Sequence, residues 1–224
     1  MILNIATFNI NKNGGDFPNR IYKLADVIGS YKIDIIAFQE DFTSDKFSSS
    51  DILNAKLKLY KYTLKTREKI RDGIKSSSNL TILSKFKAEK IDNIYFNNIK
   101  NEQRAALFLT IKIDNQKLLI INTHLCHLDT KNRIYQLKKI LEKIYTQNIK
   151  NIILCGDLNS TPNSNELKLL KNEKFNYFNK EHTAIRAKTI DYILLKGNIT
   201  SKKCEVVLKN QYSDHYCIIN AITL

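Results

Sequence analysis

The most constraining feature of the sequence is the apolar run of residues 152–155, which ends in the polar residues 156–159 (GDLN). A continuous apolar run is typical of a strand covered on both faces. Glycine then lets the backbone turn or approach another group closely. Asp157 and Asn159 are two residues apart, so they project to the same side in extended geometry. The sequence therefore predicts a buried strand that carries a carboxylate and an amide to one edge of a sheet.

A helix is predicted after this strand, with Thr161 as N-cap and Pro162 in the first helical position, extending to about Lys171. Open α/β sheets place their ligand sites at the carboxyl ends of strands, where a helix begins. Two interpretations stay open from this segment alone. It is a functional site, or it is a polar turn that caps a core strand.

Length and composition indicate one large core. The chain has 224 residues, 43% of them hydrophobic, and no linker, so we expect a single domain over residues 1–224. No stretch has the length of a transmembrane helix, and the amino terminus lacks a signal-peptide pattern. The cysteines form no CxxC pair, and Cys155 in the buried run is expected to be a small core residue. We therefore expect a cytoplasmic monomer with no membrane association.

The formal net charge of +14 indicates a polyanionic partner such as nucleic acid. Only six of the 36 Lys and Arg residues are Arg, and Lys, Asn and Ile are abundant together. An AT-rich genome produces the same mixture without selection for nucleic-acid binding. Both explanations stay open.

The first half of the chain predicts strands that end in polar residues. Residues 2–9 form the first strand and end in Asn9, a helix follows over residues 18–31, and residues 33–38 form a second strand followed by Glu40. A carboxylate at the end of a buried strand is costly unless it is solvated, paired or bound to metal.

The middle of the chain carries weaker patterns. We expect a surface loop with a short helix over residues 43–56, and strands over 57–66 and 80–83. The basic segment 67–79 between these strands is expected to be a mobile loop, either reaching over a substrate or serving as an ordinary solvated connection. Residues 85–103 are weakly patterned, whereas residues 104–113 and 117–123 predict a hairpin.

The second half predicts a β-α-β unit. Residues 130–145 have apolar side chains on one helical face and join the strand ending near His124 to the strand over 152–155. Residues 175–188 are irregular. Further strands are expected over 189–195, 204–208 and 216–224.

Polar side chains therefore recur at predicted strand ends: Asn9, Glu40, His124, Asp157, Asn159, Asp214 and His215. Together they supply oxygen ligands suited to Mg²⁺, amides suited to phosphate oxygens, and two imidazoles. No Cys/His set has zinc spacing. Asp191, between apolar neighbours, would orient a nearby imidazole such as that of His215 and raise its pKa.

Seven short motifs occur in an order that resembles a known family. They are TFNI (7–10), FQE (38–40), ILSK (82–85), NTHL (122–125), GDLN (156–159), IDYIL (190–194) and SDH (213–215). The chain resembles the endonuclease/exonuclease/phosphatase superfamily, the deoxyribonuclease-I-like metal-dependent phosphoesterases, over essentially its whole length. The resemblance implies an α/β fold, a four-layer sandwich of two mixed β-sheets flanked by helices.

The resemblance also implies roles for individual residues. Metal binding falls to Glu40 as the principal Mg²⁺ ligand, with Asn9 and Asp214 completing the site and Mn²⁺ as a substitute. Asp157 would orient or deprotonate the attacking water, Asn159 would hold the phosphate, and His215 would stabilise the transition state with Asp191 orienting it. His124 would contact the same phosphate. Asn9 is also expected to contact substrate, and Arg104 either binds phosphate or pairs with a carboxylate.

A second acidic metal ligand has no clear position, although Glu68 and Glu102 are possible. The expected function is hydrolysis of phosphodiesters, with DNA or RNA as the first choice of substrate. The alternatives are inositol phosphates, phospholipids or another small phosphoester. An inactive binding module of the same fold is the alternative outside enzymes.

Overall fold

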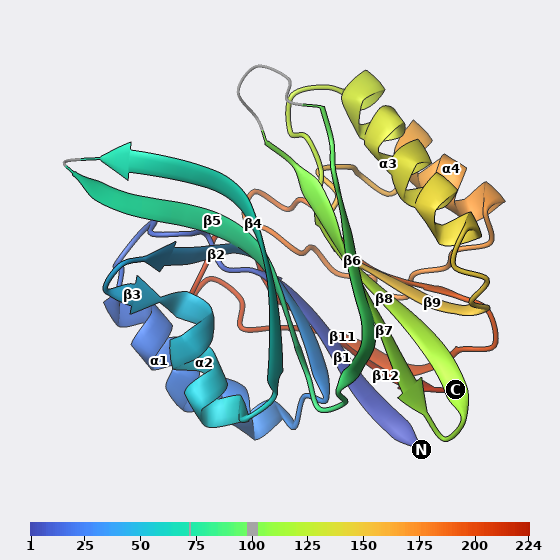
Figure 1. The fold of residues 1–224 in the computed structure, drawn as a ribbon, viewed down its shortest axis with the longest axis horizontal. Helices are drawn as coiled ribbons and strands as arrows, with labels where there is room; N and C mark the ends of the chain where they lie inside the picture. Colours follow the sequence, from blue (N-terminus) through green and yellow to red (C-terminus); the bar gives the residue numbers. More distant parts are fainter. Residues whose placement is uncertain (72, 98–102) are drawn as a thin grey trace.

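The computed structural model describes residues 1–71, 73–97 and 103–224, and it shows an α/β sandwich of four layers (Figure 1). Two sheets face each other, and helices cover the outer face of each. This confirms the fold that the sequence resemblance implied.

The first sheet contains β1 (Ile2–Asn9), β2 (Ile35–Ser44), β3 (Phe47–Ser48), β4 (Tyr60–Arg71), β5 (Ile74–Ser84), β11 (Thr200–Val207) and β12 (Cys217–Thr223). The second contains β6 (Ala88–Tyr95), β7 (Ala105–Ile113), β8 (Gln116–His124), β9 (Asn151–Asp157) and β10 (Asp191–Lys196). The helices are α1 (Asn19–Ile28), followed by the 3₁₀ turn η1 (Gly29–Tyr31), then α2 (Ser49–Leu57), α3 (Thr130–Tyr145) and α4 (Asn165–Asn172).

Both sheets are mixed. Across the described residues, the first sheet has the order β11-β12-β1-β2-β5-β4, with β3 beside β2, and the second has the order β10-β9-β8-β7-β6. Each has one parallel pair, β1 with β2 and β8 with β9. Because the carboxyl ends of parallel neighbours lie at the same edge, the polar ends of these four strands are brought together.

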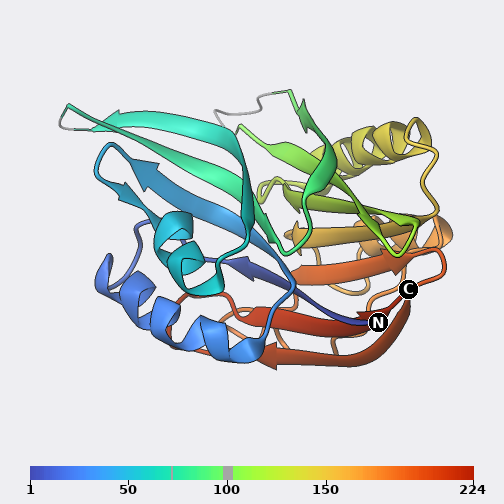
Figure 2. The same ribbon diagram turned by 60° about the horizontal axis from the view of Figure 1, so that its bottom comes forward.

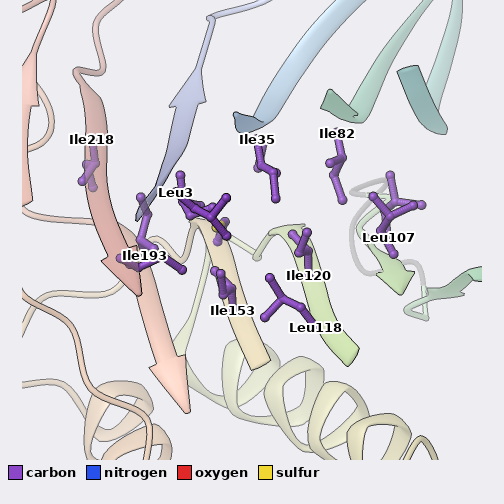
Figure 3. Close-up of a cluster of buried hydrophobic side chains, with 14 of the residues drawn as sticks. Leu3, Ile35, Ile82, Leu107, Leu118, Ile120, Ile153, Ile193 and Ile218 are labelled. Atoms are coloured by element: carbon purple, nitrogen blue, oxygen red, sulfur yellow. The ribbon is translucent and has the colours of Figure 1, made fainter. Parts of the chain in front are cut away.

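Alternate residues of the central strands face two different cores. In β9, Ile153 and Cys155 pack between the sheets (Figure 3), whereas Ile152 and Leu154 pack beneath α3 and α4. Both faces of this strand are covered, which explains its continuous apolar run. The predicted core position of Cys155 is confirmed, and all four cysteines of the chain are free thiols.

Helix boundaries follow the capping side chains. The helix predicted over residues 130–145 is confirmed as α3, where the Asp129 side chain accepts a hydrogen bond from the Asn132 amide at 2.8 Å. The predicted start of α4 was wrong. Ser164, not Thr161, is its N-cap and accepts from the Leu167 amide at 3.3 Å, so Pro162 lies in the turn before the helix. None of the helices in the described residues is both long and apolar enough to cross a membrane.

The prediction of a loop over residues 67–79 was also wrong. These residues complete β4 and β5, a long hairpin that projects from the body of the molecule and turns at Gly73 (Figure 2). Its outer part lies beyond the inter-sheet core and leaves Ile70 and Ile74 exposed. A hairpin with solvent on both faces needs no apolar alternation, so the pattern that marks a strand is missing.

Two further strands in the first half of the chain also differ from the sequence analysis. The weakly patterned segment 85–103 contains the strand β6, most of whose side chains are exposed or half-buried. The strand predicted to begin at residue 57 begins at Tyr60, because Leu57 ends α2.

We predict that Gly156→Ala destabilises the protein by about 3 kcal/mol or more. Gly156 has a φ of +142°, and a Cβ there would lie 1.9 Å from the Thr123 carbonyl oxygen of the neighbouring strand. Urea denaturation measures the change. Gly29→Ala is the matched control, since that glycine is helical and has no atom within 4 Å of an added Cβ. Equal midpoints for both variants would show that the close approach of β9 to β8 is not required.

Candidate active site

The strand registers bring the polar strand ends into one cavity. His124 of β8 and Asp191 of β10 both lie opposite Asp157 of β9. Asn9 of β1 reaches Asp157 from the other sheet, with its Nδ2 donating to Oδ2 at 3.0 Å. The resulting cavity has a volume of about 260 Å³. The predicted site residues that line it are Asn9, Glu40, Arg104, His124, Asp157, Asn159 and His215.

Asp157 lies at the centre of this arrangement. Its Oδ2 lies 3.3 Å from His124 Nε2 and 3.7 Å from His215 Nε2, and its Oδ1 accepts from the Asn159 amide at 2.9 Å. The residue is only 2% exposed. Burial, reinforced by the charge of Asp191, raises the pKa of Asp157 to about 7. A carboxyl group with such a pKa can accept a proton near neutral pH.

His215 is held by Asp191, as the sequence predicted. Its Nδ1 lies 2.9 Å from Asp191 Oδ2, which also accepts a hydrogen bond from Thr183 Oγ1 at 2.8 Å. Burial alone would lower the pKa of His215, but the charge and hydrogen bond of Asp191 and the charge of Asp157 raise it to about 10. His215 is therefore an imidazolium at neutral pH.

Thr183 was missed by sequence analysis. It lies in the irregular segment 175–188, which carries no periodic pattern and no motif. Its hydroxyl also accepts from the amides of Ile190 and Asp191 at 3.0 Å, so it fixes the start of β10.

His124 has the opposite electrostatic character. Its Nδ1 lies 3.8 Å from Glu40 Oε1 on the side away from Asp157. Burial, together with the charges of Arg104 and Lys12, lowers its pKa well below the ordinary 6.5. The cavity thus combines a neutral imidazole and a charged one.

Glu40 lies within a strand and not at its end, which corrects the prediction that β2 closes at Phe38. The pairing of β2 with β5 shifts register between Phe38 and Asp41, and Glu40 has a φ of +55°. Such a bulge re-aims a side chain, and here Glu40 lines the cavity with its Oε1 3.2 Å from Lys12 Nζ.

The neighbouring carboxylate of Asp41 has a structural environment. It is fully buried and accepts from Thr81 Oγ1 at 2.6 Å and from the Ser50 amide at 3.0 Å. Asp41 therefore links β2 to β5 and to the start of α2, and it does not line the cavity.

Asp214 is not among the described residues that line the cavity, although its neighbour His215 is. It is half-buried, and Ser213 Oγ donates to its Oδ1 at 3.3 Å. The charges of Asp214 and Glu40 both act on Arg20, whose pKa burial lowers. Asp214 is thus near Arg20, as Glu40 is, but it is not part of the cavity lining.

Arg20 is a second residue that sequence analysis missed. Its guanidinium donates to the backbone oxygens of Asn11, Lys12, Gly14 and Tyr212, at 2.7 to 2.8 Å. It therefore ties the loop after β1 to the segment before β12. Four backbone carbonyl partners, one of them 192 residues away, leave no motif in the sequence.

Two sets of side chains could hold a metal ion. Asp157, Asp191 and His215 each offer one ligand atom, and these atoms lie within 4.8 Å of one another. Sequence analysis instead chose Glu40, Asp214 and Asn9. In the first set, His215 Nδ1 already bonds the Asp191 carboxylate, which also accepts a hydrogen bond from Thr183 Oγ1. Fewer ligand atoms of this set are therefore left for a metal. In the second, Glu40 Oε1 lies 3.2 Å from the Lys12 ammonium, so a bound cation would have to take the place of this partner.

The other predicted site residues differ in how close they lie to the cavity. Arg104 lines the cavity with its Nη2 3.4 Å from His127 Nδ1. The Asn159 side chain donates to the Leu125 carbonyl oxygen at 3.0 Å, which links the ends of β8 and β9. Glu68, one possible second metal ligand, is exposed on the hairpin and pairs with Lys65 and Lys75. Glu102, the other, lies outside the described residues.

Comparison with known proteins shows the family of the chain. A sequence profile described as "Endonuclease/Exonuclease/phosphatase family" matches residues 6–215. The chain belongs to this family. The endonuclease/exonuclease/phosphatase family consists of metal-dependent phosphoesterases. A search of curated proteins finds no match.

Solved structures of the endonuclease/exonuclease/phosphatase fold match along nearly the whole chain. A family protein from Leptotrichia buccalis has a TM-score of 0.81 at 20% identity, covering 99% of this chain and 100% of its own. The catalytic domain of human Nocturnin, with a bound sulfate anion, has a TM-score of 0.79 at 18% identity, covering 99% and 93%. A mannosyl-6-phosphatase from Bacteroides thetaiotaomicron has a TM-score of 0.76 at 14% identity, covering 99% and 100%. At these identities the likeness shows the fold alone.

We predict that His215 of the metal-free protein stays protonated to about pH 10. Since this pKa is above the ordinary 6.5, the charged pair with Asp191 stabilises the fold fully below pH 6.5, and the contribution is lost as pH rises through about 10. An NMR titration of the imidazole protons measures the value. Asp191→Asn should lower it by roughly two units or more, because the main opposing charge is removed.

Asp16→Asn serves as the control for this titration, because Asp16 is an exposed carboxylate that bonds Asn19 and Lys23. An unchanged His215 pKa in Asp191→Asn would contradict the pairing. A shift of the same size in Asp16→Asn would show that the effect is a general one of net charge.

Proposed function

We propose that this protein is a Mg²⁺-dependent phosphodiesterase that hydrolyses nucleic acid, through one domain of residues 1–224. The observation that carries the proposal is the convergence of Asp157, His124 and His215 beside Glu40 in one cavity. A carboxyl group with a pKa near 7, an imidazolium and a neutral imidazole are the groups that in-line attack of water on phosphorus requires.

The polar side chains of the cavity have separate proposed roles. Asp157 accepts a proton from the attacking water, and Asn9 fixes its Oδ2 by donating to it. His215, oriented by Asp191, presents its Nε2 proton to a phosphate oxygen and stabilises the charge that develops there. His124 contacts the same phosphate, and Arg104 adds a positive charge to the cavity wall. Asn159 holds the strand end that carries Asp157.

Glu40 is the proposed principal metal ligand, with Asp214 and Asn9 on the same side of the site. A divalent cation there would polarise the phosphoryl oxygen and neutralise developing charge. Asp214 would act through water, since it does not line the cavity in the described part of the chain. Asp157, Asp191 and His215 are better suited to proton transfer, because His215 bonds Asp191 through Nδ1 and faces Asp157 through Nε2.

Charge around the cavity supports a polyanionic substrate. Lys12, Arg67 and Arg104 line it, and the Arg67 guanidinium makes no hydrogen bond or ion pair with another described residue. The net charge of +14 acts in the same direction. A small phosphoester is the second candidate, because one similar structure is named a mannosyl-6-phosphatase. An inactive binding module is disfavoured by the complete set of polar groups.

Hydrolysis should require Mg²⁺ or Mn²⁺ and stop in EDTA, because Glu40 offers hard oxygen ligands. Glu40→Gln should raise the Mg²⁺ concentration needed for half-maximal rate by roughly tenfold or more, in line with losses from altered metal ligation. Glu68→Gln, which changes an exposed carboxylate outside the cavity, is the matched control. Full activity after exhaustive chelation would exclude the metal mechanism.

Asp157→Asn and His215→Ala should each lower kcat by roughly 100-fold or more. Asp191→Asn should reproduce part of the His215 defect, and the combination with His215→Ala should be little worse than His215→Ala alone. Defects that multiply in the double variant would show that the two residues act independently.

A substrate panel tests the function as a whole. It contains plasmid, single-stranded DNA, RNA, a 5′-phosphotyrosyl oligonucleotide, sphingomyelin and inositol phosphates, each with Mg²⁺. We expect cleavage of nucleic acid, with an affinity that falls with salt at a slope of about −0.9 per phosphate contacted. Cleavage confined to the lipid or inositol substrates would overturn the nuclease proposal and leave the metal site intact.

A further inference from the structure

We propose that a second cavity, next to the catalytic one, binds a nucleobase of the substrate, an inference that rests on the proposed nuclease function. This aromatic groove has a volume of about 440 Å³. It lies between the β4–β5 hairpin and a cluster of three phenylalanines. Phe17 comes just before α1, Phe42 follows the bulge in β2, and Phe47 lies in β3. The residues that define it are Lys12, Phe17, Phe42, Phe47, Arg67 and Lys69.

The aromatic groove is continuous with the catalytic cavity. Lys12, Arg67 and Ser78 line both. Phe42 lies on β2 only two residues beyond Glu40, the proposed metal ligand. A substrate whose phosphate is held in the catalytic cavity therefore has its next group within reach of the phenylalanine rings.

Three rings form one wall of the groove. The Phe17 ring centre lies 5.2 Å from that of Phe42 and 4.6 Å from that of Phe47, both edge to face. All three side chains are only half-buried, although residues of this type are usually buried. Aromatic rings exposed in a cavity beside a phosphate site are typical platforms for base stacking.

The rest of the lining is complementary to a nucleotide. Lys12, Arg67 and Lys69 supply positive charge, and no acidic side chain is among the described residues that line the groove. Four serines, Ser44, Ser76, Ser77 and Ser78, also line the groove and make this part of it polar. An acyl chain has no charge to pair with the cations, and an inositol phosphate has no aromatic face to stack on the phenyl rings, whereas a nucleotide has both.

A single tryptophan tests the groove independently of catalysis. The chain contains no tryptophan, so Phe42→Trp reports only from this site. The titration is done in EDTA, which stops the proposed hydrolysis. Oligothymidylate should quench the fluorescence of the introduced tryptophan, and an abasic oligomer of equal length should quench it much less. Phe47→Trp is a second reporter if Phe42→Trp does not fold. Tyr22→Trp is the matched control, because Tyr22 contacts Phe47 but does not line the groove.

Kinetics give a second readout. Phe42→Leu should lower kcat/KM for an oligonucleotide by roughly 5- to 150-fold, the range expected when stacking of one base is lost. Tyr22→Leu should leave it unchanged.

Equal quenching by the abasic oligomer, or quenching by a short-chain lipid instead of the oligonucleotide, would overturn the base assignment. If the wild-type protein cleaves nucleic acid but the tryptophan variants show no quenching, base binding in the aromatic groove is wrong and the proposed function stands. If quenching occurs but the wild-type protein does not cleave nucleic acid, the proposed function is wrong and base binding in the groove stands.

Discussion

The packing of two sheets face to face is the constraint on which the rest of this structure depends. Together with the helices on the outer faces, it buries β1, β2, β8 and β9 on both sides, so polar groups within these strands must be hydrogen-bonded and most of the others lie near the strand ends. Because each sheet has a parallel pair in this region, those ends lie at one edge. The position of the candidate active site is therefore a consequence of how the core is built, and Asn9 of one sheet meets Asp157 of the other there.

Burial at that edge sets the electrostatics. Asp157 and Asp191 lie in nearly dry surroundings, where an isolated carboxylate is unstable, and His215 between them is kept charged as a result. His124, on the other side of Asp157, is buried near the cations Arg104 and Lys12 and is kept neutral. The same burial thus produces one charged and one neutral imidazole within one cavity.

The site is completed by elements outside the strand ends. The bulge at Glu40 turns that carboxylate into the cavity, and Arg20 fixes the two loops beside it through backbone carbonyls. The β4–β5 hairpin contributes Arg67 and Ser78 to the wall of the cavity and extends it into the aromatic groove. The proposed catalytic groups therefore come mainly from the central strands, whereas the proposed surfaces for the rest of a substrate come from the periphery.

The sequence by itself determined the family and the sandwich that the family implies, because seven motifs occur in order along the chain. It also determined the extent of α3, because the apolar side chains on one helical face form a local pattern. Only the tertiary structure decided the β4–β5 hairpin, the cap of α4, the bulge at Glu40 and the contacts of Thr183 and Arg20. Those features depend on partners far away in the chain, such as the Tyr212 carbonyl oxygen that Arg20 binds. A local sequence pattern cannot predict a contact between two residues that are 192 positions apart.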